Sequence, residues 1–458
     1  MAKHNLRRRS ATASAGISLA LLLAACGGGG GTDGGGDAGG GGGGGDECAA
    51  FGDYGKHEGK ELTVYSPIRD EDGETLASSF EQFSECTGVE VNYEGSGEFE
   101  AQLPVRVQGG NAPEIALLPQ PGLLQRFAES GDLKEASPEA RANTEKNWNP
   151  EWVEYGSHNG KFYAPPLGAN VKSFVWYSPK AFQEAGYEVP KTQDELKALS
   201  DRIVADGKGK PWCAGIESGD ATGWPATDWL EDFMLRTAGP ETYDKWIAHE
   251  IPFNDPAVKE AAEAAGQYLK NPDYVNGGLG DVQSITTTAF QEAGLPIMDG
   301  DCWMHRQASF YATNWPEDSD VSENGDVFAF YLPAESAEGE QPVLGGGEFI
   351  GAFSDEPHVM AFQRYLASLE YVQKRAELGP GSWVTAAKGV KEGTYKNPID
   401  QLSYQTLQDP EAVFRFDASD LMPAEVGAGS FWRGMTDWIN GAETDAVLDQ
   451  IEKSWPEK

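Results

Sequence analysis

Residues 62–118 read LTVYSPIRDEDGETLASSFEQFSECTGVEVNYEGSGEFEAQLPVRVQGGNAPEIALL, in which short apolar runs alternate with amphipathic stretches. The runs 62–65, 89–93 and 115–118 have the length and pattern of strands. Between them, apolar residues recur at helical spacing: Leu76, Phe80, Phe83 and Cys86 within 71–86, then Phe99, Leu103 and Val107. This alternation predicts βαβ units and a mostly parallel sheet flanked by helices, which binds ligands at the carboxyl ends of its strands.

The alternation continues beyond this stretch. A third helix is expected to end at Gly131, and the apolar run 173–177 predicts a strand just after a change of pattern that indicates a domain crossover. Thr192 and Glu195 have the spacing of a helix-initiating capping box. Further strands are expected at 327–331 and 349–351, and one long helix from about Pro357 to Glu377.

Charge and composition narrow the class of protein. The chain has 458 residues with 35 Lys and Arg against 73 Asp and Glu, a formal net charge of -38. A nucleic-acid partner is therefore excluded, because binding a phosphate backbone needs a positive patch. Apolar residues make up 39% and aromatic residues 11%, which is enough for a packed core of two or three domains.

The N-terminus has the pattern of a bacterial lipoprotein. A basic head (Lys3, Arg7–Arg9) precedes an apolar run, and Leu23-Ala24-Ala25-Cys26 fits a lipobox. We therefore expect residues 1–25 to be a signal peptide and Cys26 to be lipidated. The general secretory route is favoured, with twin-arginine export as the alternative.

Residues 26–47 predict a flexible tether, since 15 of the 19 residues in 27–45 are Gly. A tether of this kind keeps a folded body close to a membrane, or spaces a surface enzyme from the cell wall.

Four further cysteines, Cys48, Cys86, Cys213 and Cys302, form an even set in an exported chain, so disulfides are expected. Of the three possible connectivities we favour Cys48 with Cys86 and Cys213 with Cys302, because each pair lies within one half of the sequence. The six His are scattered without metal-ligand spacing. No metal and no cofactor are predicted.

Tryptophan gives the positive signal for function. The chain has 13 Trp, and in 223–229 two of them flank Asp228 at a predicted helix start. Aromatic faces stack on the C–H faces of sugars while carboxylates accept hydrogen bonds from hydroxyls. Trp212 and Trp303 adjoin cysteines, which favours packing. The candidate ligand-binding residues are Ser96, Glu98, Gln120, Trp224, Asp228, Trp229, Trp383, Asp417 and Trp432.

The sequence contains no Gly-x-Ser-x-Gly elbow, no His-Glu-x-x-His and no P-loop, so these enzyme classes are not indicated. A tethered glycoside hydrolase stays an alternative, because its carboxylate pair leaves no local signature. A glycan-binding surface protein is a second alternative. A receptor for phosphorylated ligands would need Arg or Lys at the site, and the candidate loops contain none.

Several stretches together resemble the extracellular solute-binding proteins of ABC importers, of the maltose-type family, and within it the alpha-glucoside-binding branch. The stretches are 109–122, 172–179, 212–218, 224–229 and 416–420, and the resemblance spans Leu62 to about Trp438.

This resemblance implies a two-lobed flytrap that closes on a sugar and delivers it unchanged to a membrane permease and its ATPase. It supports the Cys213 to Cys302 pairing. It implies ligand-binding roles for Glu98, Gln120, Trp224, Asp228 and Asp417, to which Glu348 is added.

From this resemblance we expect three parts. Residues 48–165 form the first part of the N-lobe, residues 166–355 form the C-lobe, and helices in 356–458 return to the N-lobe and complete the cleft. Each lobe is expected to hold a mostly parallel sheet flanked by helices. The protein is expected to be a monomer, exported and held by its lipid at the outer face of the cytoplasmic membrane.

Overall fold

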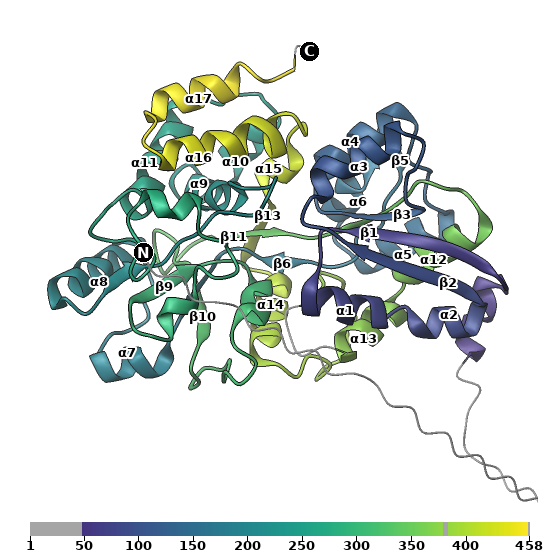
Figure 1. Cartoon of the computed structure of the whole chain (residues 1–458), viewed down its shortest axis with the longest axis horizontal. Coiled ribbons are helices and arrows are strands. Elements are labelled where there is room, and N and C mark those ends of the chain that lie inside the picture. Colours follow the sequence, from purple (N-terminus) through teal and green to yellow (C-terminus); the bar gives the residue numbers. More distant parts are fainter. Residues whose placement is uncertain (1–47, 379–382, 457–458) are drawn as a thin grey trace, which may run out of the picture. The chain divides into compact units, whose positions relative to one another are not determined.

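The computed structural model describes residues 48–378 and 383–456, which belong to one unit, residues 47–458 (Figure 1). The predicted signal peptide, the lipidation site Cys26 and the Gly-rich tether lie outside the described residues.

The first sheet has the strand order β12-β3-β1-β2. Its strands are β1 (Lys60–Ser66), β2 (Val89–Gly95), β3 (Ile115–Leu118) and β12 (Phe349–Ala352). β1 pairs in parallel with both β2 and β3, and β12 joins the edge antiparallel to β3. The predicted strands of this region and its mostly parallel direction are thus confirmed. Leu62, Val64 and all four residues of β3 are buried.

Helices surround this sheet: α1 (Asp70–Ser78), α2 (Glu81–Thr87), α3 (Phe99–Gln108), α4 (Pro121–Ser130), α5 (Pro138–Asn147), α6 (Pro150–Tyr155), α12 (Pro357–Leu366) and α13 (Leu369–Leu378). The turn η1 (Ala49–Tyr54) and the hairpin β4 (Ser157–His158) with β5 (Lys161–Phe162) complete this half. As predicted, α4 ends at Gly131, which adopts a left-handed conformation.

Two long helices predicted from periodicity are each divided in the structure. The apolar residues of 71–86 are buried together as expected, but α1 ends and α2 begins around Ser79. The Ser79 hydroxyl donates to the carbonyl of Leu76 (2.5 Å). Likewise α12 and α13 are separated at Ser368, whose hydroxyl donates to the carbonyl of Tyr365 (2.7 Å). Serine side chains compete for helix carbonyls, and these breaks leave the apolar spacing unchanged.

The second sheet has the order β10-β7-β9-β8. Its strands are β7 (Phe174–Tyr177), β8 (Lys210–Trp212), β9 (Cys302–Arg306) and β10 (Phe328–Tyr331). β7 is antiparallel to both of its neighbours, while β8 and β9 are parallel. Three of the four strands therefore share a direction, but most pairings are antiparallel. The expectation of mainly parallel pairing is wrong for this lobe, because the opposing strand is central and not at the edge.

The second half is rich in helices: α7 (Pro179–Ala185), α8 (Gln193–Asp206), α9 (Trp224–Thr237), α10 (Pro240–Ile247), α11 (Pro256–Leu269), α14 (Pro398–Gln408), α15 (Ala418–Leu421), α16 (Trp432–Ile439) and α17 (Thr444–Glu452). Short turns are η2 (Gln283–Thr286), η3 (Leu295–Ile297), η4 (Ser309–Asn314) and the π-helical η5 (Val426–Phe431). Thr192 caps α8 as predicted by accepting from the amide of Glu195, while the Glu195 side chain accepts from the amide of Lys191 and not of Thr192.

A three-stranded sheet, β13-β11-β6, lies where the chain passes between the two halves. Its strands are β6 (Asn170–Val171), β11 (Gln341–Gly346) and β13 (Ala412–Phe416). β6 leads directly into β7 of the second sheet, and β11 leads into β12 of the first. The crossover expected before 173–177 is therefore present.

The last helices pack differently from the prediction. α12 joins the core of the first sheet, as expected, but α16 and α17 pack against α9 and α11 in the second core (Figure 1). The apolar side of α16, with Met435, Trp438 and Ile439, is buried there. The prediction that 356–458 returns as a whole to the N-lobe is thus wrong for its final part.

Both expected disulfides, Cys48–Cys86 and Cys213–Cys302, are present. The first joins the N-terminal turn to α2, and the second joins the segment after β8 to β9. Trp212 and Trp303, which adjoin the second bond, are buried in the core as expected.

Candidate functional site

A cavity of about 310 Å³ lies at the carboxyl ends of strands from the first and the middle sheets, facing loops of the second half. The loops after β1, β2 and β3 supply Arg69, Ser96 and Gln120. Opposite them stand the start of α9, with Trp224, and the turn η4. This placement agrees with the expectation that such sheets bind ligands at the carboxyl ends of their strands.

Most of the candidate residues meet in the wall of this cavity: Ser96, Gln120, Trp224, Glu348, Trp383, Asp417 and Trp432. They come from positions as far apart as Ser96 and Trp432 in the sequence. Glu98, Asp228 and Trp229 do not line the cavity.

Trp229 is a core residue, which corrects its assignment to the site. Its ring stacks on Phe233 at 6.2 Å between centroids and meets Trp212 edge-on at 5.2 Å. Trp224 and Trp229 are five residues apart on one helix, which turns their side chains roughly 140° from each other. Only Trp224, at the first position of α9, faces the cavity.

Asp228 is fully buried one turn after Trp224, and it is a structural carboxylate. It accepts from Lys172 Nζ (3.0 Å) and forms an ion pair with Arg306 (3.3 Å). Burial raises the pKa of Asp228 to about 7, although the two cations act in the opposite direction. Its oxygens are occupied by these partners and not offered to a ligand.

Glu98 lies at the edge of the site, where it is exposed at the start of α3. A hydrogen bond with the carboxyl group of Asp220 raises the pKa of Glu98. Asp220 belongs to the segment between β8 and α9. Elsewhere at the cavity, Thr313 of η4 donates to Asp72 of α1 (3.2 Å). Side chains of the two halves thus meet directly next to the cavity.

A network of buried charges underlies the cavity. Asp417 accepts from Lys172 Nζ (2.6 Å), from the amide of Asp420 (2.8 Å) and from the hydroxyl of Ser419 (2.7 Å). Burial opposes ionisation, but the Lys172 ammonium lowers the pKa of Asp417. Asp417 is therefore both the cap of α15 and a charged part of the cavity wall.

The deeper part of this network joins Asp232 to Arg306 and to Arg236 (2.7 Å). Asp228, Glu231 and Asp417 are the one group of possible metal ligands that the described residues bring together. Lys172 Nζ is bonded to two of the three, so an ammonium supplies the positive charge there. Burial raises the pKa of the third, Glu231, well above its ordinary value.

Cations that the sequence analysis missed line the cavity: Arg69, Lys172 and Arg375. The expectation of no Arg or Lys at the site is therefore wrong. All three lie outside the candidate loops, but the position of Lys172 in the sequence indicates a special role. Lys172 directly precedes the apolar run 173–177, which predicts a buried strand. A lysine next to such a strand is rarely buried unless its charge has a partner.

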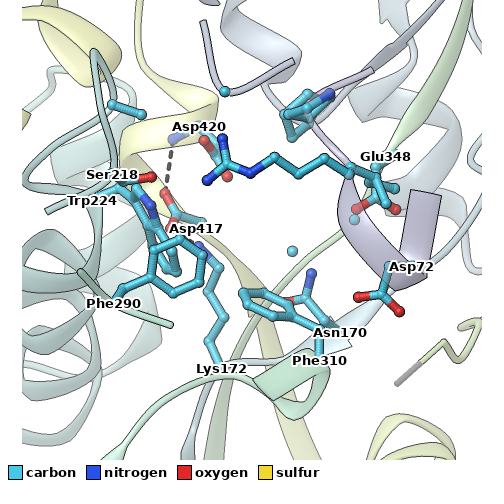
Figure 2. Close-up of a pocket in the computed structure, with 18 of the residues that line it drawn as sticks. Asp72, Asn170, Lys172, Ser218, Trp224, Phe290, Phe310, Glu348, Asp417 and Asp420 are labelled. Carbon is cyan, nitrogen blue, oxygen red and sulfur yellow. Dashed lines mark hydrogen bonds and ion pairs between the residues drawn. The ribbon is translucent and has the colours of Figure 1, made fainter. Parts of the chain in front are cut away.

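Aromatic rings form one wall of the cavity (Figure 2). Trp224 meets Phe290 edge-on at 5.0 Å and Phe310 at 6.1 Å. Neither phenylalanine was predicted, because neither lies in a stretch with the apolar periodicity of a helix or strand. Trp383 and Trp432 also line the cavity, and Trp432 donates its Nε1 hydrogen to Ser419 (3.3 Å).

Several polar atoms in the wall are buried without a hydrogen-bond partner among the described residues: Gln120 Oε1, Asn170 Oδ1, Arg375 Nε and Trp383 Nε1. Buried polar atoms are seldom left in this state, because each loses its contact with water. Buried carboxyl groups accompany them. Burial raises the pKa of Glu348 to about 7, and it also raises the pKa values of Glu100 and Asp420.

Chemically, the cavity offers flat apolar rings, acceptor oxygens and N–H donors. In Figure 2, Trp224, Asp417 and Lys172 lie together on one side, and Glu348 and Asp72 on the other. This arrangement suits a small molecule with many hydroxyl groups and apolar C–H faces.

Comparison with known proteins gives the class. A family model described as bacterial extracellular solute-binding protein matches residues 67–373. The alpha-glucosides-binding periplasmic protein AglE of Rhizobium meliloti is 40% identical over 409 residues, 87% of each chain. The osmoprotective compounds-binding protein GgtB of Synechocystis sp. is 39% identical over 415 residues, 89% of this chain and 96% of GgtB.

Solved structures share the fold at lower identity. The bacterial solute receptor AcbH has a TM-score of 0.72 at 19% identity, over 86% of this chain and 98% of AcbH. The GacH receptor of Streptomyces glaucescens has a TM-score of 0.66 at 16% identity, over 87% of this chain and 97% of GacH. The predicted two-lobed α/β fold is thereby confirmed.

The chain belongs to the bacterial extracellular solute-binding protein family. This family consists of binding proteins, as the sequence analysis expected. Among the helices that the structure describes, none has the length and apolar character needed to cross a membrane.

Proposed function

We propose that this protein is the receptor of an ABC importer for a short alpha-glucoside, which it hands unchanged to a membrane permease and its ATPase. The observation that carries this proposal is the set of unpartnered polar atoms, among them Gln120 Oε1 and Asn170 Oδ1, in a cavity walled by aromatic rings. Sugar hydroxyls would satisfy these atoms while the sugar faces lie on the rings.

The relatives support the class of ligand. AglE is named for alpha-glucosides and GgtB for osmoprotective compounds, and each covers most of this chain. The volume of about 310 Å³ is at the small end of ligand pockets, which are usually about 300–1,000 Å³. A mono- or disaccharide suits this volume better than a long glucan.

The arrangement of the protein follows from the same proposal. The N-lobe contains β1–β3, β12, α12 and α13, and the C-lobe contains β7–β10 with α16 and α17. The site comprises Ser96, Gln120, Trp224, Glu348, Trp383, Asp417 and Trp432. The protein acts as a monomer without catalysis, and a lipid on Cys26 holds it at the outer face of the cytoplasmic membrane.

A titration tests the function. Tryptophan fluorescence and calorimetry would be followed with maltose, trehalose, sucrose, longer malto-oligosaccharides and monosaccharides. Saturable binding that is tightest for a short alpha-glucoside is expected. Failure of every saccharide to bind would overturn the proposal, and turnover of an aryl alpha-glucoside would place the protein among the glycoside hydrolases instead.

A further inference from the structure

Lys172 occupies an unusual place in the cavity wall. It follows β6, on the segment that crosses from one half to the other, and its side chain is only 8% exposed. Its ammonium donates to Asp228 Oδ1 (3.0 Å) and to Asp417 Oδ2 (2.6 Å). The same nitrogen lies 5.2 Å from the centre of the Trp224 ring. Two residues of the cavity wall, Trp224 and Asp417, and the buried Asp228 therefore meet at one charged group, as Figure 2 shows for Trp224 and Asp417.

One of the N–H groups of the ammonium has no hydrogen-bond acceptor among the described residues. A lysine ammonium carries three N–H groups, and the two carboxylates take two of them. The residue is part of the cavity wall, so a ligand oxygen can accept the third. The positive charge is already balanced by Asp228 and Asp417, which leaves no demand for an anionic ligand.

We propose that Lys172 is a specificity-determining residue that gives a charged hydrogen bond to an oxygen atom of a neutral saccharide. Through its two ion pairs it also holds Asp417, and through its contact with the ring it holds Trp224, on the same part of the ligand. This inference rests on the proposed function of the cavity and adds to it a residue and the type of ligand atom that the residue recognises.

The rest of the charge network provides a matched control. Arg236 is as deeply buried as Lys172 and is bonded to Asp232 (2.7 Å), but it does not line the cavity. A residue that serves stability alone should behave like Arg236. A residue that also binds the ligand should differ from it in affinity.

The experiment compares Lys172→Met with Arg236→Met by calorimetry, using the saccharide that wild-type protein binds most tightly in the panel above. Both variants are expected to lower Tm, because each removes a cation that is paired with a buried carboxylate. Only Lys172→Met is expected to weaken binding, by about tenfold or more, the loss typical of a hydrogen bond to a charged group. Equal affinities for Lys172→Met and wild type would overturn the inference while leaving the proposed function intact.

A second pair of variants tests whether the change in affinity comes from an unbalanced buried charge that disturbs folding. Lys172→Met combined with Asp228→Asn, and Arg236→Met combined with Asp232→Asn, each remove one charge of either sign. The same difference in affinity is expected between them. A sugar phosphate is the final probe: if wild type binds glucose 1-phosphate more tightly than the neutral sugar and Lys172→Met abolishes this preference, Lys172 recognises an anion and the inference is wrong. If wild type binds no saccharide, both the proposed function and the inference fail.

Discussion

At the scale of single residues, the side of a helix on which a residue lies decides between core and site. Trp224 and Trp229 lie on α9 with similar neighbours in sequence, yet the first lines the cavity and the second stacks on Phe233. The sequence predicted that both rings stack on a sugar. It could not separate them, because α9 is buried on nearly every side and its apolar pattern does not indicate which side meets a cavity.

The two tryptophans should therefore respond differently to truncation. Trp224→Ala is expected to weaken saccharide binding by about 1–3 kcal/mol with little change in Tm, because it removes a stacking surface. Trp229→Ala is expected to lower the free energy of unfolding by about 3–5 kcal/mol, because it leaves a cavity in the core. Calorimetry and urea denaturation measure the two effects. The assignment of the rings is contradicted if Trp224→Ala binds as tightly as wild type.

Glu348 should make the stability of the ligand-free protein depend on pH. Burial raises its pKa from 4.5 to about 7 in the folded protein. Between these values the folded state holds a proton that the unfolded chain releases, so this group's contribution to stability falls as pH rises, by at most about 1.4 kcal/mol per pH unit. Above about pH 7 the contribution is lost.

Urea denaturation at several pH values from 4.5 to 7 would compare wild type with Glu348→Gln. The variant is expected to show a shallower decline in stability over this range, because its side chain cannot release a proton. Glu90→Gln, at an exposed position of β2, is the control and should follow wild type. If the free energy of unfolding falls equally with pH in wild type and in Glu348→Gln, Glu348 is not the source of the pH dependence.

At the scale of elements, the start of α9 is fixed by a glycine. Gly223 has a φ of 116°, and an added Cβ would lie 2.1 Å from the carbonyl oxygen of Trp432. The backbone of α16 thus approaches the start of α9 closely, and this approach places both Trp224 and Trp432 at the cavity.

Gly223→Ala is expected to destabilise the fold by more than the roughly 1–2 kcal/mol of the backbone strain alone, and to weaken saccharide binding as well. Gly207→Ala is the matched control. Gly207 also has a positive φ, of 63°, but nothing lies within 4 Å of its added Cβ, and it ends α8 away from the cavity. Gly207→Ala should lower the free energy of unfolding and leave the affinity for the saccharide unchanged. An unaffected affinity in folded Gly223→Ala would show that α9 does not depend on this contact.

The sequence predicted helices and strands more accurately than it predicted the residues of the site. The strands at 62–65, 89–93 and 115–118 and the cap at Thr192 were confirmed, because periodicity and capping are local properties. The breaks at Ser79 and Ser368 were missed, because a serine that turns to bond a helix carbonyl leaves the apolar spacing intact.

At the scale of the whole molecule, the site depends on contacts that no local pattern contains. Lys172 and Asp417 are separated by 245 residues in sequence and joined at 2.6 Å. The crossings β6 to β7 and β11 to β12 bring such segments together. The candidate list could name residues at the ends of strands, because strand ends gather at one edge of a sheet. It could not predict Phe290, Phe310 or Arg375, whose places follow only from the tertiary fold.

The proposed function requires the two lobes to close around a sugar. The contact of Thr313 with Asp72 beside the cavity joins residues of the two halves. A ligand that touches both halves should shift the population toward the closed state.

Small-angle X-ray scattering of the purified protein, with and without a saturating saccharide whose binding calorimetry has established, tests this claim most directly. The radius of gyration should fall when the saccharide is added, and Trp224→Ala, which weakens binding, should need more saccharide to reach the same value. An unchanged radius of gyration at full occupancy would contradict closure and with it the mechanism proposed for this receptor.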